Sequence, residues 1–306
     1  MGSKPKDRKR DVCGVEALLR YRSLMGDPIF PNEFIPLLER TGMINEVGLW
    51  VLEQALFQCK KWCSHIPDIG VSVNFSIVQF DDILIAEKVK KILEKPEMPG
   101  YALTIEITES VEMQGNEHLR KTFRLLCSLG IAFSIDDFGT GYSNLSYLKR
   151  LNVNEIKIDR IFINGIQNNT YNHKLIHNII EFAKSGSIRV CCEGVESIKE
   201  LSVLEVLQPD LLQGYLFAKP GTAEETEKNY INKDAVEYKK YSDFIEDLYQ
   251  VKSRTGFIPF DHKRILDETD VGLWIIRMDE SKGYYELHAD ETMERIMDVE
   301  RKFTPR

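Results

Sequence analysis

The sequence contains no uninterrupted apolar run that approaches the ~20 residues needed to span a membrane. It also lacks the basic, apolar and small-residue succession of a secretory signal peptide. We therefore expect a cytoplasmic chain without membrane contact of its own, which leaves open whether a longer natural protein is tethered. Positive charge is scarce too, with 40 Lys and Arg against 48 Asp and Glu and a net charge of −8. An acidic chain repels polyanions, so we expect no nucleic acid polymer as a partner.

Paired metal-binding cysteines are also missing. None of the six cysteines has the spacing of a zinc site, and we expect all of them to be reduced, buried thiols. They are Cys13, Cys59, Cys63, Cys127, Cys191 and Cys192.

What the sequence does contain is a regular alternation of strand-like and helix-like segments. The 306 residues are 43% hydrophobic, enough for one large core or two smaller ones. Strand-length apolar runs occupy residues 12–19, 71–75, 102–107, 131–136, 155–158, 188–192 and 211–217. Helical periodicity is found at residues 46–64, 83–94, 116–129, 170–185 and 197–206. This order predicts an α/β fold with a parallel sheet, which a (β/α) barrel closes most economically.

Polar side chains occupy the late positions of these strands. They are Glu16, Asn74, Glu106, Asp136, Asp137, Lys157, Glu193 and Gln213. In a barrel the carboxyl ends of the strands meet at one rim, so we expect these groups to share a basin. A cluster of carboxylates repels itself and is costly to desolvate unless cations relieve it. Oxygen ligands favour Mg²⁺, Mn²⁺ or Ca²⁺ over zinc.

Seven ordered motifs resemble those of the EAL family of cyclic di-GMP phosphodiesterases over residues 12–225. They are VEALLR (15–20), VNFS (73–76), EITES (106–110), DDFGTGYSNLSYLKRL (136–151), EIKIDR (155–160), CEGVES (192–197) and QGYLFAKP (213–220). The long DDFGTG-containing motif is the most specific of them. The resemblance implies a modified TIM barrel with two Mg²⁺ or Mn²⁺ ions that converts cyclic di-GMP to linear pGpG.

The resemblance also implies a role for each matched residue. One metal would be held by Glu16, Asn74, Glu106 and Asp136, and the second by Asp136 and Asp137. The catalytic group would be Lys157, Glu193, Gln213 and Glu109: Glu193 and Gln213 act on water at the metals, Lys157 lies beside the attacking hydroxide, and Glu109 braces the following loop. Arg20 and Leu18 would contact the substrate.

The role of Lys157 stays open at this point. Lys157 could serve as a base if nearby cations lower its pKa, or stay charged and stabilise the transition state.

We expect the loop at 138–146 to be a lid in which Gly139 and Gly141 take positive φ angles. His173 and His177 are four residues apart on an expected helix, and we interpret them as a solvated helix face.

The sequence departs from the family pattern at its start, where the usual first strand is absent. A missing strand leaves an edge with unpaired backbone groups, which a partner chain, a swapped segment or the C-terminal tail could cover. We expect residues 1–11 to be a polar leader whose first residues are typical of a cloning scar. Residues 226–306 predict a polar helix, a β-hairpin with its turn at residues 280–283, and a further helix, together resembling the start of a PAS-like domain. About 35 residues are too few for an independent core, so the hairpin should dock on the barrel or be partly disordered.

Three functions are consistent with these features. The first is a catalytically competent cyclic di-GMP phosphodiesterase, and the second is a cyclic di-GMP receptor or scaffold that does not cleave its ligand. The third is a barrel enzyme acting on another phosphodiester. Family members commonly pair through the region after Asp137, so we also expect a homodimer.

Overall fold

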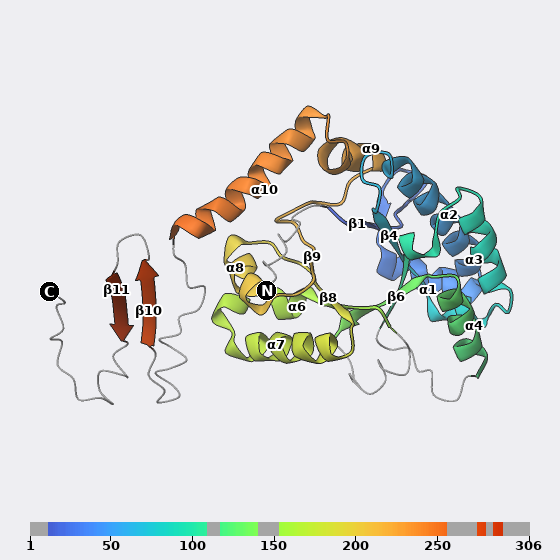
Figure 1. The fold of residues 1–306 in the computed structure, drawn as a ribbon. Helices are drawn as coiled ribbons and strands as arrows, with labels where there is room; N and C mark the ends of the chain where they lie inside the picture. The colour runs from blue at the N-terminus through green and yellow to red at the C-terminus, as the bar shows by residue number, and fades with distance from the viewer. Residues whose placement is uncertain (1–11, 109–116, 140–152, 256–273, 280–283, 290–306) are drawn as a thin grey trace.

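The structure is a computed structural model that describes residues 12–108, 117–139, 153–255, 274–279 and 284–289 (Figure 1). Its centre is one sheet of seven parallel strands, in the order in which they occur in the sequence. The strands are β1 (Gly14–Ala17), β4 (Gly70–Asn74), β5 (Leu103–Thr108), β6 (Ala132–Phe138), β7 (Glu155–Ile158), β8 (Arg189–Cys192) and β9 (Leu211–Leu212). This confirms the seven predicted strands, although the last is only two residues long.

The sheet is curled into a half-barrel whose two edges are β1 and β9. Within the described ranges, β1 pairs only with β4 and β9 only with β8. The incomplete barrel expected from the sequence is therefore the architecture observed.

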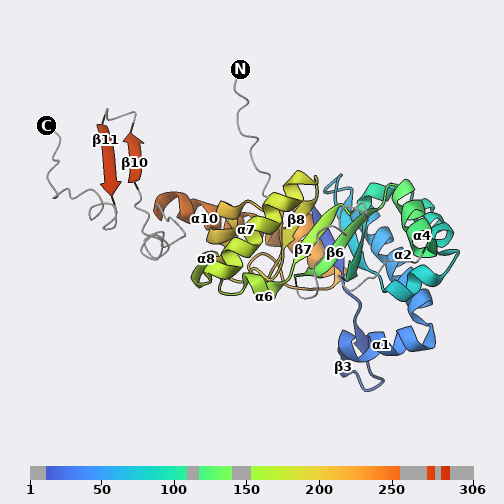
Figure 2. The ribbon, with the colours of Figure 1, turned by 90° about the horizontal axis from the view of Figure 1, so that it is seen from below.

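Helices cover the outer face of this sheet (Figures 1 and 2). They are α2 (Ile44–Trp62), α3 (Ile85–Glu94), α4 (Glu117–Ser128), α6 (Arg160–Ile163), α7 (Thr170–Ser185) and α8 (Ile198–Leu207), whereas α1 (Pro31–Thr41) projects from the body of the molecule (Figure 2). Shorter 3₁₀ turns are η1 (Ile77–Asp81), η2 (Gly100–Ala102) and η3 (Ile166–Asn168). The five predicted helices are confirmed as α2, α3, α4, α7 and α8, whereas α1 was not predicted.

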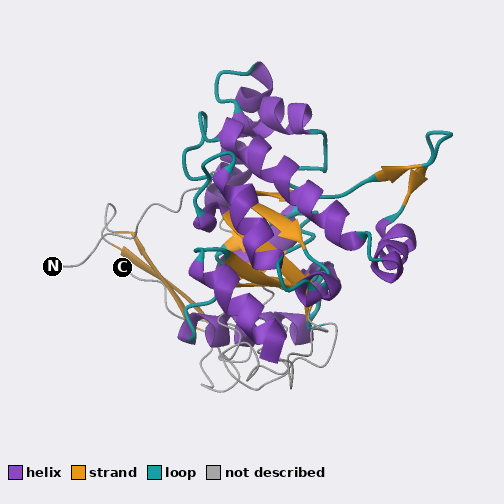
Figure 3. Ribbon diagram, turned by 90° about the vertical axis from the view of Figure 1, so that its right-hand side faces the viewer, coloured by secondary structure: helices purple, strands orange, loops and turns teal. Residues whose placement is uncertain are grey.

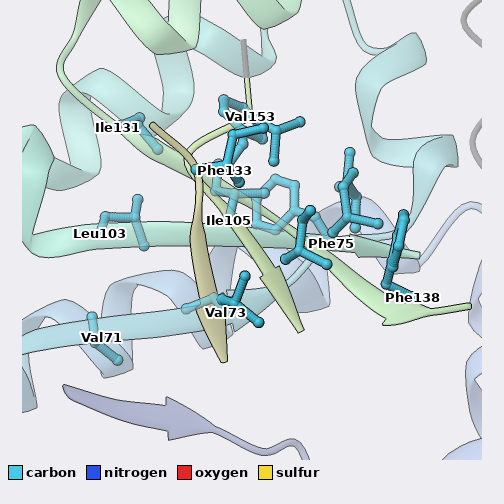
Figure 4. Packing of buried hydrophobic residues seen from close by; sticks show 14 of the residues in the cluster. Val71, Val73, Phe75, Leu103, Ile105, Ile131, Phe133, Phe138 and Val153 are labelled. Carbon is cyan, nitrogen blue, oxygen red and sulfur yellow. The ribbon is translucent and has the colours of Figure 1, made fainter. Parts of the chain in front are cut away.

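The two faces of the strands differ because alternate residues point to opposite sides of a sheet. On β4 and β5 the outward set includes Val71, Val73, Leu103 and Ile105, all buried beneath the helices (Figure 4). The core also contains an aromatic cluster in which the rings of Phe123 and Phe133 stack with centroids 3.7 Å apart. The polar side chains lie at the alternate positions of the same strands. Packing of the apolar side chains against the helices therefore turns the polar ones toward the inside of the half-barrel.

A hairpin and α1 form an arm that leaves the barrel directly after β1. The strands of this hairpin are β2 (Tyr21–Arg22) and β3 (Pro28–Ile29), paired antiparallel. Figures 2 and 3 show the arm projecting from the body of the molecule.

The C-terminal segment continues from the barrel through α9 (Ala223–Thr226), the π-helical η4 (Glu227–Ile231) and α10 (Val236–Thr255). It is anchored on α2, where Trp62 Nε1 donates to Glu227 Oε2 at 3.0 Å, and Ile231 is fully buried. The predicted hairpin is confirmed as antiparallel β10 (Trp274–Asp279) and β11 (Tyr284–Ala289). It lies beyond α10, away from the barrel, and not docked on it (Figures 1 and 2). Its turn and the helix expected after it fall outside the described ranges.

No helix in the described part of the chain is both long and apolar enough to cross a membrane. All six cysteines are free thiols, but the expected burial is wrong for three of them, because Cys13 is exposed and Cys63 and Cys127 are half-buried.

Candidate active site

The polar residues singled out in the sequence come together at the carboxyl end of the sheet. Asn74 ends β4, Glu106 and Asp136 lie late in β5 and β6, and Glu193 directly follows β8. The strands are parallel and adjacent, with Asn74 in register with Glu106 and Thr108 with Asp136. Their side chains therefore share one basin inside the half-barrel.

The ammonium group of Lys157 is the centre of this basin. It lies 2.6 Å from Glu193 Oε1, 2.9 Å from Glu106 Oε2, 3.3 Å from Glu16 Oε2 and 3.7 Å from Asp136 Oδ1. The side chains of Lys157 and Glu106 are only 3% and 1% exposed. Burial disfavours the ammonium form of Lys157, but the surrounding carboxylates outweigh this and raise its pKa. In this arrangement Lys157 is charged.

Glu16 connects the basin to the two edges of the sheet. Its Oε1 accepts a hydrogen bond from Asn74 Nδ2 at 2.8 Å, and its Oε2 accepts one from Gln213 Nε2 at 2.9 Å. The Gln213 contact joins the residue after β9 to β1, so a single side chain spans the two edges. Burial acts to raise the pKa of Glu16, but Lys157 and these two donors lower it overall.

The two adjacent aspartates owe their placement to an irregular backbone. The pairing of β6 with β7 shifts register between Ile135 and Phe138, and Asp137 has φ = 53°. Such bulges re-aim side chains, and Asp tolerates positive φ better than most residues. The backbone N–H of Asp137 donates to Asp136 Oδ1 at 3.0 Å. Gly139 follows with φ = 99°, as expected, and an added Cβ would come within 2.9 Å of the Phe162 ring.

The other carboxyl groups of the basin retain protons more strongly than usual. Burial, together with the charge of Glu16, raises the pKa of Glu106 to about 8. Burial raises the pKa of Glu193 to about 7 and, with the charge of Asp136, that of Asp137 to about 6. One ammonium group is therefore too little positive charge for this set of carboxylates.

The chemistry of these side chains fits divalent cations. The donors are carboxylate and amide oxygens, which suit Mg²⁺ or Mn²⁺. Burial is the main cause of the raised pKa values and neighbouring carboxylates add to it, so added cations would offset the cost of ionising these groups. The side chains point at Lys157 at present, and no group of three or more His, Cys, Asp or Glu among the described residues is already arranged around a common metal position. Each carboxylate contacts Lys157 through one oxygen, which leaves its other oxygen as a possible metal ligand.

Several predicted residues lie outside this cluster. Arg20 and Leu18 are exposed beyond the end of β1, and Arg20 Nη1 donates to the backbone oxygen of Leu19. Glu109 and residues 140–146 of the expected lid, which include Gly141, lie outside the described residues, as does the rest of the segment 140–152, where we expect the dimer contact. On α7, His177 is exposed and His173 half-buried.

No role was assigned to Asp159 from the sequence, although it lies in the EIKIDR motif, directly before Arg160. It caps α6, where its Oδ1 accepts from the Ile161 amide at 2.8 Å. It also hydrogen-bonds the side chain of Asp137 and adds negative charge beside Asp136. Its position directly after a buried strand was the available signal.

The chain forms a parallel half-barrel in which carboxylates surround a buried lysine at the C-terminal ends of the strands. These features are typical of barrel proteins that place their chemistry at the strand ends. The sequence model of the EAL domain matches residues 6–220, and the chain belongs to this family.

The relatives and solved structures agree with this assignment. The chain is 36% identical over 216 residues to the bifunctional diguanylate cyclase/cyclic di-GMP phosphodiesterase MucR of Pseudomonas aeruginosa, covering 70% of this chain and 31% of MucR. It is 34% identical over 220 residues to the cyclic di-GMP phosphodiesterase PdeR of Escherichia coli, covering 72% of this chain and 33% of PdeR. The structure of the MucR phosphodiesterase in complex with cyclic di-GMP superposes with a TM-score of 0.65 at 36% identity, covering 70% of this chain and 87% of that one. The matched region thus spans about a third of these curated relatives.

Proposed function

We propose that this chain is a metal-dependent phosphodiesterase that hydrolyses cyclic di-GMP to linear pGpG. The observation that supports it most is the convergence of Glu16, Asn74, Glu106, Asp136 and Lys157 on one basin. Membership of the EAL family, whose relatives MucR and PdeR are named as cyclic di-GMP phosphodiesterases, supplies the substrate.

The proposed metal ligands are the oxygen donors of this basin. One ion would be held by Glu16, Asn74, Glu106 and Asp136, and a second by Asp136 and Asp137. When bound, the ions supply positive charge that attracts the phosphodiester and makes a nearby water more acidic. The acidic rim would otherwise repel an anionic substrate.

The chain's own side chains would carry the remaining steps. Lys157 is charged, which favours stabilisation of negative charge on the reacting phosphate over a role as general base. Glu193 Oε1, 2.6 Å from Lys157 Nζ, is a proton acceptor for the attacking water. Gln213 orients Glu16, and Arg20 lies exposed beside the rim, where it can contact a phosphate.

Hydrolysis in this scheme breaks one bond of the cyclic dinucleotide. The oxygen of water bonds to phosphorus, and the bond between phosphorus and the 3′ oxygen breaks. Glu193 takes up one proton of the water and later releases it to solvent, and the leaving 3′ oxygen takes one proton from solvent. The product is linear pGpG with a 5′ phosphate.

A non-catalytic cyclic di-GMP receptor is the second candidate. It is favoured by one observation: β1 is an edge strand within the described part of the sheet. Glu16, which lies on β1, is therefore supported by a neighbouring strand on one side only.

We further propose that the chain works in the cytoplasm as one module of a larger signalling protein and pairs as a homodimer through the region after Asp137. Light scattering at assay concentration checks the dimer. A strictly monomeric mass would rule it out.

Chromatographic analysis of cyclic di-GMP incubated with the purified chain and Mg²⁺ or Mn²⁺ tests the function. Formation of pGpG that stops on addition of EDTA supports the phosphodiesterase. Calorimetric binding without product supports the receptor. A panel of other phosphodiesters tests the third candidate, which would be supported by faster turnover of one of them than of cyclic di-GMP.

A further inference from the structure

The turn that carries Asn74 is held by a contact outside the basin. Ser76, two residues after Asn74, donates a hydrogen bond from its hydroxyl to Glu39 Oε1 at 2.6 Å. Both side chains are half-buried. Glu39 lies in the last turn of α1, so this bond ties the end of the arm (residues 21–41) to the carboxyl end of β4.

The same turn is held from its other side by α2. The backbone N–H of Ser76 donates to Gln79 Oε1 at 3.1 Å, and Gln79 is fully buried. Gly48 of α2 packs directly on Gln79, since an added Cβ there would lie 2.2 Å from Gln79 Nε2. The backbone N–H of Ser76 is thus fixed by a packed side chain, whereas its hydroxyl donates to Glu39 and accepts from the Val78 amide at 3.3 Å.

The arm closes a ring around one corner of the basin. It leaves the sheet after Glu16 on β1 and returns through Glu39 to Ser76, and Asn74 then donates to Glu16 at 2.8 Å. Because β1 is an edge strand in the described sheet, β4 alone supports it from within the sheet. The contact of Glu39 with Ser76 supplies a second constraint on the pair formed by Glu16 and Asn74.

We propose that Glu39 is a positioning residue that acts through Ser76 to hold Asn74 in its ligating place beside Glu16. The inference rests on the proposed function, because only there is Asn74 a metal ligand. Partners that orient metal ligands typically contribute 10- to 100-fold to metal affinity, and this contact is one residue more remote, so we expect an effect of about tenfold.

The test is Mn²⁺ affinity of the full chain, measured by electron paramagnetic resonance of free Mn²⁺. Glu39→Ala and Ser76→Ala should each weaken binding about tenfold. Glu39→Gln and Ser76→Thr keep the acceptor and the hydroxyl, so both should bind like wild type. Glu225→Ala is the matched control, because Glu225 makes a similar carboxylate contact, with the Thr222 amide at 2.8 Å, on α9.

A double mutant separates positioning from general loosening. If Glu39 acts through Asn74, Glu39→Ala adds no further loss of affinity in the Asn74→Ala background. Full additivity of the two losses, or wild-type affinity in Glu39→Ala, would overturn the proposal.

Hydrogen exchange of residues 74–79 in metal-free protein distinguishes failure of this inference from failure of the proposed function. Faster exchange in Glu39→Ala, but not in Glu225→Ala, is expected whether or not metal binds. Should wild type bind no Mn²⁺, the metal-dependent function falls. In that case, unchanged exchange at residues 74–79 in Glu39→Ala overturns the positioning role. Faster exchange there supports the inference that Glu39 stabilises the turn after β4.

Discussion

Strands β5, β6 and β7 lie in the middle of the sheet with a partner on each side, whereas β1 and β9 have one partner strand each in the described structure. The middle strands supply Glu106 and Lys157, which are almost completely buried. The edges supply Glu16, with 14% of its side chain exposed, and Gln213, which is exposed. The core fixes the central groups, while the edge groups depend on side-chain hydrogen bonds. The centre and the edges of one site should therefore respond differently to substitution.

Glu106→Gln, in the centre, should have the largest effect on turnover. The substitution keeps the size of the side chain but removes its charge, so the fold should survive. Without this carboxylate the metal ions should stabilise the transition state less, by several kcal/mol. Such a loss corresponds to a fall of about a thousandfold or more in Mg²⁺-dependent turnover. Product analysis by chromatography measures it, with Glu225→Gln as the control. Wild-type rates in Glu106→Gln would remove this residue from the metal site.

Lys157→Met should mainly affect stability. Among the described residues, Lys157 supplies the ammonium group that contacts four buried or half-buried carboxylates. Its removal leaves uncompensated charge, which typically costs about 3–5 kcal/mol. Denaturant unfolding in EDTA measures this loss, and added Mn²⁺ should recover part of it. The exposed pair of Lys184 and Glu181, 2.9 Å apart, provides the control Lys184→Met, for which we expect no measurable change. Equal stability of both variants would contradict a charge-balancing role for Lys157.

Gln213→Ala, at the edge, should reduce turnover less than the central substitution. A hydrogen bond to a charged group contributes about 1.5–3 kcal/mol, which corresponds to roughly 10- to 100-fold. Stability should barely change because the side chain is exposed. The control is Gln58→Ala, which removes an amide donor to Glu227 away from the sheet rim. A loss as large as that of Glu106→Gln would erase the distinction between centre and edge.

Deletion of residues 256–306 should have the smallest effect. The hairpin lies away from the barrel (Figure 1), so turnover should stay within about twofold, the range of surface changes. By contrast, Ile231→Ala, in the anchored segment before α10, should cost about 2–5 kcal/mol because Ile231 is fully buried. Thermal unfolding and turnover of the two variants test this boundary. A strong loss of turnover on deletion would show that the tail acts on the site.

The sequence was most informative where periodicity or motif order carries the signal. The seven strands and five of the helices follow from alternating apolar runs, and the core residues on β4 and β5 follow from strand parity. The residues that meet at Lys157 were all predicted, because the ends of parallel strands share one rim.

The features that the sequence did not predict leave little trace in the residue pattern of any one segment. The arm was missed because its strands are two residues long and α1 contains Pro36 in its interior, which argues against a helix. The positive φ of Asp137 depends on the register of β7, and the bond between Glu39 and Ser76 joins segments 37 residues apart. The ion pairs of Lys157 likewise depend on how far the half-barrel curls, which no single strand specifies.

The most direct test is a side-by-side assay of cyclic di-GMP turnover by wild type with Mn²⁺, wild type with EDTA, and Glu106→Gln with Mn²⁺. We predict linear pGpG in the first reaction and none in the other two. Equal pGpG in all three would contradict a site built from Glu106 and its metal ions. Binding of cyclic di-GMP without pGpG in any of them would contradict catalysis and identify a receptor.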